Sequence, residues 1–258
     1  MPSRTVEMWD VPIPLSAIAR LSEEQRFTYY LLGHMFNELN CLQKMIGFAM
    51  PKHDDRRLAR LRPELAQVFF LFRIACSKMW EGKLSLDAKE VGMTLRDFIF
   101  PQMEKGPERW KELQAAINAA PWLKAMRNGM GFHFPKFQEW RTFTTPTESW
   151  VDDHMYLCET TGNTFYDAAD TITQVWMLGQ YDLKNSDPEA VVDPLVIEMI
   201  DLLRLMNSFL EDVLGVFIGE IILKGKGERA LSGKVLAPDF AHASLPFWTS
   251  DKPKAQKR

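Results

Sequence analysis

The chain has 258 residues, of which 31 are basic and 34 acidic, so its formal charge is −3. Hydrophobic residues make up 46% and charged residues 25%, which is ordinary globular usage and excludes a disordered or low-complexity chain. A near-neutral balance gives no general preference for nucleic acid, so any such binding requires a local patch.

Cysteine usage and hydropathy favour a cytoplasmic protein. Cys41, Cys76 and Cys158 are widely spaced and form no Cys-x-x-Cys pair, which argues against a disulfide scaffold and a structural zinc cluster. The N-terminal residues lack the apolar core of a secretory signal. The most apolar stretch, residues 195–223, contains six charged residues, too many for a membrane span.

The first half of the chain predicts several helices. Ser22 and Gln25 form a capping box, and apolar residues then recur at helical spacing as far as Pro51. A second helix is expected after Pro63, and its apolar content on most sides places it centrally in the core. That helix is expected to end near Gly82. Further helices with prolines at their boundaries are expected over residues 87–100, 108–120 and 122–134.

The second half predicts one β-hairpin between helices. Residues 155–159 and 164–166 are the strand candidates, because they flank a Thr-Thr-Gly-Asn turn. Helices are expected over residues 167–179 and from Pro194 to Leu223. The prediction is an all-α helical bundle with one small β-hairpin. Residues 1–223 form the mainly helical domain, and residues 224–258 a basic C-terminal extension containing glycine and proline.

The segment over residues 124–135 contains the strongest candidate for chemistry. Asn128 directly follows Arg127, and five residues separate Arg127 from His133. In this segment the chain resembles the HEPN superfamily (higher eukaryotes and prokaryotes nucleotide-binding domains), whose motif is an arginine, four to six residues and a histidine. The resemblance implies an all-α fold, a homodimer and, for the prokaryotic toxin or defence type, a metal-independent endoribonuclease that leaves 2′,3′-cyclic phosphates.

These residue types suit RNA cleavage without a metal or cofactor. The reaction needs a base that takes the proton of the 2′-hydroxyl and a cation that stabilises the charge on the phosphorane. Histidine titrates near neutral pH and suits the first role. A guanidinium stays charged and can contact two phosphate oxygens at once. We therefore expect His133 to act as the base, Arg127 to hold the scissile phosphate and Asn128 to orient either group.

Two glycines affect the geometry of the motif. On a continuous helix, Arg127 and His133 would lie about 120° apart and roughly 9 Å apart along the axis. Gly131 follows Arg127 by four positions and Gly129 precedes His133 by four, so each side chain has a bare neighbour on its own face. Such a notch would let a phosphate or another helix approach the backbone, although each glycine weakens the helix by about 1 kcal/mol.

Two further sets of residues complete the predicted site. Glu38, on the first long helix, resembles the polar residue that HEPN proteins often place near the motif, so it is expected to hold Arg127 or polarise His133. Four arginines within seven positions are candidate contacts to an RNA backbone, although two neighbouring aspartates dilute their charge. These arginines are Arg56, Arg57, Arg60 and Arg62.

Two other functional classes stay open at this point. One is a non-catalytic HEPN-like module that binds RNA, a nucleotide or a partner protein such as an antitoxin. The other is a metal-binding helical enzyme that uses His34 and Glu38, which are one helical turn apart. Burial distinguishes the classes, because a catalytic pair must share a cleft that solvent can reach.

Overall fold

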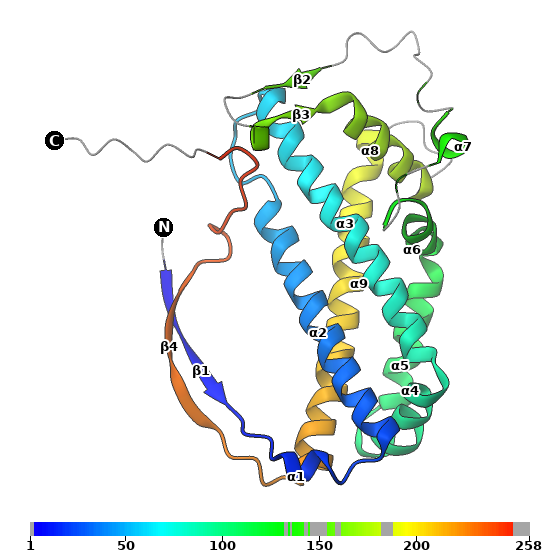
Figure 1. Cartoon of the computed structure of the whole chain (residues 1–258), viewed down its shortest axis with the longest axis vertical. Coiled ribbons are helices and arrows are strands. Elements are labelled where there is room, and N and C mark those ends of the chain that lie inside the picture. Colours follow the sequence, from blue (N-terminus) through cyan, green and yellow to red (C-terminus); the bar gives the residue numbers. More distant parts are fainter. Residues whose placement is uncertain are drawn as a thin grey trace, which may run out of the picture.

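The computed structural model describes residues 3–131, 134, 136–141, 144, 154–157, 161–181 and 188–249. Within these residues the chain is mostly helical, with two small two-stranded antiparallel sheets (Figure 1). The prediction of an all-α fold is therefore confirmed at this level. In the described part of the chain, none of the helices combines the length and the apolarity that a membrane crossing requires.

The elements have the following bounds. The long helices are α2 (Glu23–Ala49), α3 (Leu58–Asp87), α5 (Gly106–Ala119), α8 (Asp167–Tyr181) and α9 (Pro188–Val216). The short helices are α1 (Leu15–Ile18), α4 (Lys89–Thr94), α6 (Pro121–Met126) and α7 (Phe137–Trp140). Turns of π-helix are η1 (Leu95–Ile99), η3 (Arg127–Gly131) and η5 (Phe217–Ile222), and 3-10 turns are η2 (Phe100–Gln102) and η4 (Thr161–Asn163). The strands are β1 (Ser3–Asp10), β2 (Met155–Tyr156), β3 (Phe165–Tyr166) and β4 (Ala230–Pro238).

Helix α2 begins where the capping box predicts. The backbone N–H of Gln25 donates to Ser22 Oγ at 3.2 Å, and the backbone N–H of Ser22 donates to Gln25 Oε1 at 3.0 Å. Both interactions satisfy donors that the first turn of a helix leaves free. The buried residues of α2 recur every three or four positions, so one face packs into the bundle against α3 and α9.

Helix α3 extends beyond its predicted bounds at both ends. It begins at Leu58, ahead of Pro63, which has no N–H to donate to the carbonyl of Ala59 one turn earlier. The indole Nε1–H of Trp248 donates to that carbonyl at 3.1 Å and so replaces the missing partner. At the other end Gly82 does not stop the helix; a Cβ at this position would lie 2.5 Å from Met206 Cε, so the glycine permits close packing against α9.

The core is built around α3, as predicted. Phe72, Ala75, Cys76 and Met79 on this helix are completely excluded from solvent. Helices α2, α6, α8 and α9 pack around it, and α5 closes the bundle against α9. Apolar burial on most sides of α3 is therefore the main source of cohesion between the helices.

The sheets confirm one strand prediction and add a second pairing. The expected hairpin forms through Met155 paired with Tyr166 and Tyr156 with Phe165; among the described residues its strands are shorter than the predicted 155–159 and 164–166. Strand β1 pairs antiparallel with β4, so the N-terminal residues join the C-terminal extension in one ribbon beside the bundle (Figure 1). This ribbon was not predicted, because polar and apolar residues alternate only over Thr5–Met8 within β1.

Three other helices differ from their predicted extents. The helix expected over residues 87–100 is divided into α4, η1 and η2. The helix expected over residues 122–134 runs as α6 and η3 to Gly131. Helix α9 begins at Pro188, where a missing N–H costs no intrahelical hydrogen bond, and Pro194 lies inside the helix.

Truncating the centre of α3 is expected to destabilise the fold strongly. Phe72→Ala should lower the free energy of unfolding by about 3–5 kcal/mol, because it leaves a cavity at a position with no solvent exposure. Phe70→Ala is the matched control, since Phe70 lies on the same helix but is 52% exposed. Urea denaturation of both variants measures the difference, and equal losses would contradict the placement of α3.

Candidate functional site

Arg127 lies where α6 passes into the π-helical turn η3, and two neighbours orient its side chain. Its Nε donates to Glu81 Oε1 at 2.7 Å, and its Nη2 lies 2.6 Å from the same oxygen. Its Nη1 donates to Asn128 Oδ1 at 3.0 Å. The Arg127 side chain is still 39% exposed. A guanidinium has five N–H donors, so this arrangement fixes its plane and leaves donors for a ligand.

A second cation lies close to Arg127. Lys124 precedes Arg127 by three positions on the same helical segment, and its Nζ lies 5.8 Å from the centre of the Trp80 ring. Residues three apart on a helix share a face, so Lys124 adds positive charge on the side of α6 that carries Arg127. This charge offsets part of the negative charge that Glu81 brings.

Gly129 allows α8 to pack against the turn η3. A Cβ on Gly129 would lie 2.3 and 2.4 Å from two ring carbons of Trp176, so only glycine fits below this indole. The notch that the sequence analysis expected is thus occupied on the Gly129 side by another helix. Trp176 is itself 7% exposed, so the contact belongs to the core.

His133 lies outside the described residues. The structure therefore gives the surroundings of Arg127 and Asn128 without the position of the expected base. Gly131, the last residue of η3, is two positions before His133 in the chain.

A half-buried polar cluster between α3 and α8 was not predicted from the sequence. Asp170 accepts a hydrogen bond from Gln174 Nε2 at 2.6 Å and interacts electrostatically with Arg73. Burial raises the pKa of the Asp170 carboxyl and lowers the pKa of the Arg73 guanidinium. Arg73 precedes Glu81 by eight residues on α3, about 12 Å along the axis, so the cluster lies near Arg127 but is separate from it.

A sequence signal for this cluster did exist. Arg62 and Arg73 are eleven residues apart, which is about three helical turns, so they share one face of α3. Asp167, Asp170 and Gln174 likewise recur at helical spacing on α8. Two complementary polar stripes on predicted helices indicate that the helices pack together along them.

Glu38 holds a different residue from the one expected. Its two carboxylate oxygens accept hydrogen bonds from Lys78 Nζ at 2.9 and 2.8 Å, and His34 Nε2 lies 3.6 Å away. The carboxylate beside Arg127 is Glu81 of α3, in the place for which the sequence suggested Glu38. The physical reason is proximity, because α6 and η3 pack directly on α3, whereas Glu38 reaches α3 from α2.

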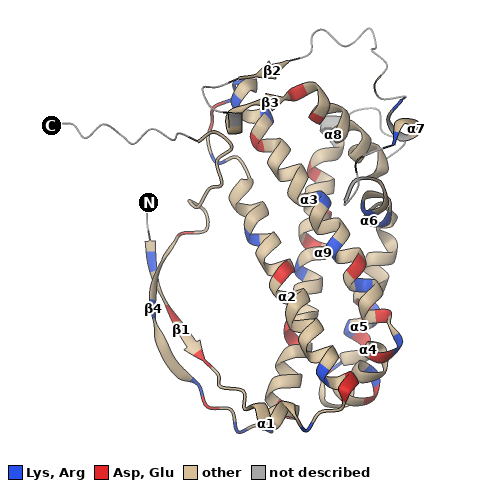
Figure 2. Cartoon of the chain, viewed as in Figure 1, with Lys and Arg blue, Asp and Glu red and all other residues tan. Residues whose placement is uncertain are grey.

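The four clustered arginines are largely paired within the chain. Arg57 and Arg60 both contact Asp55, Arg60 also lies 3.5 Å from Glu64, and Arg62 pairs with Asp167. The hydrogen bonds from Arg57 hold the pKa of Asp55 well below its ordinary value. Figure 2 shows acidic and basic residues interspersed along the helices rather than separated. Of the four arginines, Arg56 and Arg57 are exposed; because Arg57 is engaged with Asp55, Arg56 is the better candidate for a phosphate contact.

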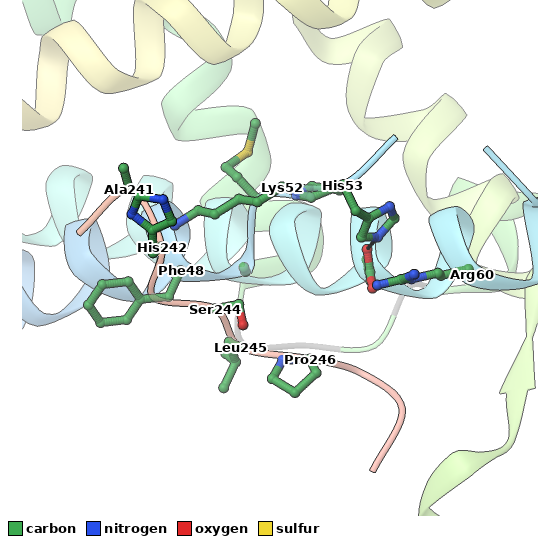
Figure 3. Close-up of a pocket in the computed structure, with 13 residues that line it drawn as sticks. Phe48, Lys52, His53, Arg60, Ala241, His242, Ser244, Leu245 and Pro246 are labelled. Atoms are coloured by element: carbon green, nitrogen blue, oxygen red, sulfur yellow. Dashed lines mark hydrogen bonds and ion pairs between the residues drawn. The ribbon is translucent and has the colours of Figure 1, made fainter. Parts of the chain in front are cut away.

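A small cavity lies between the α2–α3 connection and the C-terminal extension (Figure 3). Its volume is about 260 Å³. Lys52 reaches toward the extension and donates to the carbonyls of Phe240 and Ala243, while His53 Nε2 lies 2.6 Å from Glu64 on the Arg60 side. These polar groups fasten the extension to the bundle, so the cavity marks a structural junction.

No metal centre is present among the described residues, where no three His, Cys, Asp or Glu side chains come together. His34 and Glu38 therefore have no third ligand of these types within that part of the chain. Comparisons with family models, curated proteins and solved structures found no match.

Substituting Gly129 is expected to disturb the site and the core together. Gly129→Ala should lower the free energy of unfolding by about 1–3 kcal/mol, because the added methyl meets the rigid Trp176 ring. Gly179→Ala is the control, since a Cβ there meets open space and should stabilise α8 by up to about 1 kcal/mol. Thermal unfolding of both variants measures the effects; a stabilised Gly129→Ala would contradict this packing.

The burial of Asp170 predicts a pH-dependent stability. A carboxyl whose pKa is higher in the folded state than its ordinary value of 3.8 stabilises the fold when protonated. This contribution is present below the ordinary value and is lost as the pH rises through the folded-state pKa. Relative to Asp170→Asn, the wild type should therefore lose stability as the pH rises above about 4. Urea unfolding at several pH values measures the difference, and a rise with pH would refute the assignment.

Proposed function

We propose that the chain is a metal-independent endoribonuclease of the HEPN type, with His133 as the base and Arg127 on the scissile phosphate. The observation that carries this proposal is the arrangement of Arg127, which Glu81 and Asn128 orient while its side chain stays partly exposed. Lys124 adds a second cation on the same helical segment. An oriented guanidinium is suited to a phosphate because its parallel N–H groups match two phosphate oxygens.

The chemistry assigns each group one task. His133 takes the proton of the 2′-hydroxyl, and the resulting oxygen attacks the adjacent phosphorus. The bond from phosphorus to the 5′-oxygen breaks, which leaves a 2′,3′-cyclic phosphate on one fragment and a 5′-hydroxyl on the other, its proton coming from a general acid or from water. Arg127 stabilises the negative charge that grows on the phosphorane oxygens. Asn128 keeps the guanidinium in its plane.

The second candidate is a HEPN-like module that binds RNA or a partner without cleaving it. The ion pair between Arg127 and Glu81 favours it, because such a pair also serves to join α6 and η3 to α3. In that case Arg127 is a structural residue, and its removal changes stability rather than cleavage.

Cleavage assays in EDTA separate the two candidates. Purified wild type should cleave a mixture of tRNA, rRNA and mRNA and leave 2′,3′-cyclic phosphate ends. His133→Ala should reduce the rate about 10²–10⁴-fold, and Arg127→Ala about 10²–10³-fold, because each removes a group needed in the transition state.

Arg96→Ala is the matched control, because Arg96 is an exposed arginine paired with Asp97 on another part of the bundle. It should cleave at the wild-type rate. Equal cleavage by wild type and His133→Ala would refute the proposed base. Binding of these RNAs without any cleavage would support the non-catalytic module.

A further inference from the structure

The ribbon formed by β1 and β4 has an unpaired edge. All eight residues of β1 are exposed, and most of β4 is as well. In the described part of the chain these two strands form a sheet of their own that no third strand joins. A lone two-stranded sheet is marginally stable in water, and its outer edges present free backbone N–H and C=O groups. The ribbon therefore offers a surface for another strand.

One face of β1 is apolar at its centre and oppositely charged at its ends. Residues that alternate along a strand share a face, so Arg4, Val6 and Met8 lie on the same side. The register with β4 shifts between Met8 and Trp9, but the extra residue belongs to β4, so β1 keeps its alternation and Asp10 follows on that side. Val6 and Met8 are 40% and 46% exposed, and Val235, opposite Val6 on β4, is 43% exposed. An apolar centre between an arginine and an aspartate is complementary to a second copy of itself in the antiparallel direction.

We propose that β1 pairs antiparallel with β1 of a second copy of this chain, about a two-fold axis at Glu7. The product is a four-stranded sheet in the order β4–β1–β1–β4. Arg4 of each chain then lies opposite Asp10 of the other, and Val6 lies opposite Met8. Opposite charges and apolar side chains are favourable cross-strand pairs, and each forms twice because a two-fold interface is symmetric.

The charges along β1 select this register. A shift of the axis to Val6 places Arg4 opposite Met8, and a shift to Met8 places Asp10 opposite Val6. The axis at Glu7 brings two glutamates together, but Lys234 of the same chain lies 3.0 Å from each Glu7 carboxylate and offsets its charge. This interface does not rest on the proposed ribonuclease activity.

A cysteine scan tests the register in the full-length protein with Cys41→Ser and Cys158→Ser as background, since Cys76 is buried. Glu7→Cys should form an intermolecular disulfide under mild oxidation, because opposite Cα atoms in an antiparallel pair are about 4.5–5.5 Å apart. Thr5→Cys is the control on the same face, since the two cysteines would be separated by about 13 Å along the strands. The first variant should run at twice the chain mass of 29.8 kDa on a non-reducing gel, and the second at the chain mass.

Exchange of charges tests the same interface without cross-linking. Arg4→Asp or Asp10→Arg alone should shift the protein toward the monomer in sedimentation equilibrium, and the double variant R4D/D10R should restore the dimer. This rescue separates the interface from misfolding, which a second substitution would not repair. A wild type that stays monomeric at micromolar concentrations would overturn the proposal. So would a dimer that is insensitive to these charges and not cross-linked through Glu7→Cys.

Discussion

The burial of α3 among four other helices is the constraint on which the rest of the structure depends. Its apolar side chains supply the centre of the core, and the same helix carries charged residues at partly exposed positions along its length. Three neighbouring elements each supply an oppositely charged partner for one of these residues. Glu38 of α2 meets Lys78, Asp167 of α8 meets Arg62, and Arg127 of η3 meets Glu81. The order of helices around α3 thus follows from both packing and charge pairing.

Packing against α3 also determines the orientation of the Arg127 guanidinium. Glu81 fixes the direction of the guanidinium before any ligand binds, which is the preorganisation that phosphate chemistry requires. Glu81 also reduces the local positive charge, and Lys124 restores part of it. Gly129 adds a steric requirement, because the close approach of Trp176 holds η3 against α8. The position of Arg127 therefore depends on α3, α6 and α8 together.

The sequence predicted the features that are decided locally. The capping box at Ser22, the central place of α3 and the hairpin pairing of Tyr156 with Phe165 are read from neighbouring residues. The start of α3 could not be read in this way, because the carbonyl that Pro63 leaves free is satisfied by Trp248 from the other end of the chain. The partner of Arg127 was missed for the same reason, since helical spacing does not say which carboxylate on which helix lies beside it. The pairing of β1 with β4 also joins the two ends of the chain, and polar and apolar residues alternate only over Thr5–Met8 within β1.

In the proposed reaction, a histidine base and an oriented arginine cleave RNA together. The most direct measurement is the pH dependence of single-turnover RNA cleavage in EDTA. A histidine base predicts a rate that rises as the pH increases through the neutral range and then reaches a plateau, because the base must be unprotonated. A rate that depends on added divalent metal would contradict this reaction. So would a rate that keeps rising tenfold per pH unit into the alkaline range, as when hydroxide itself deprotonates the 2′-hydroxyl.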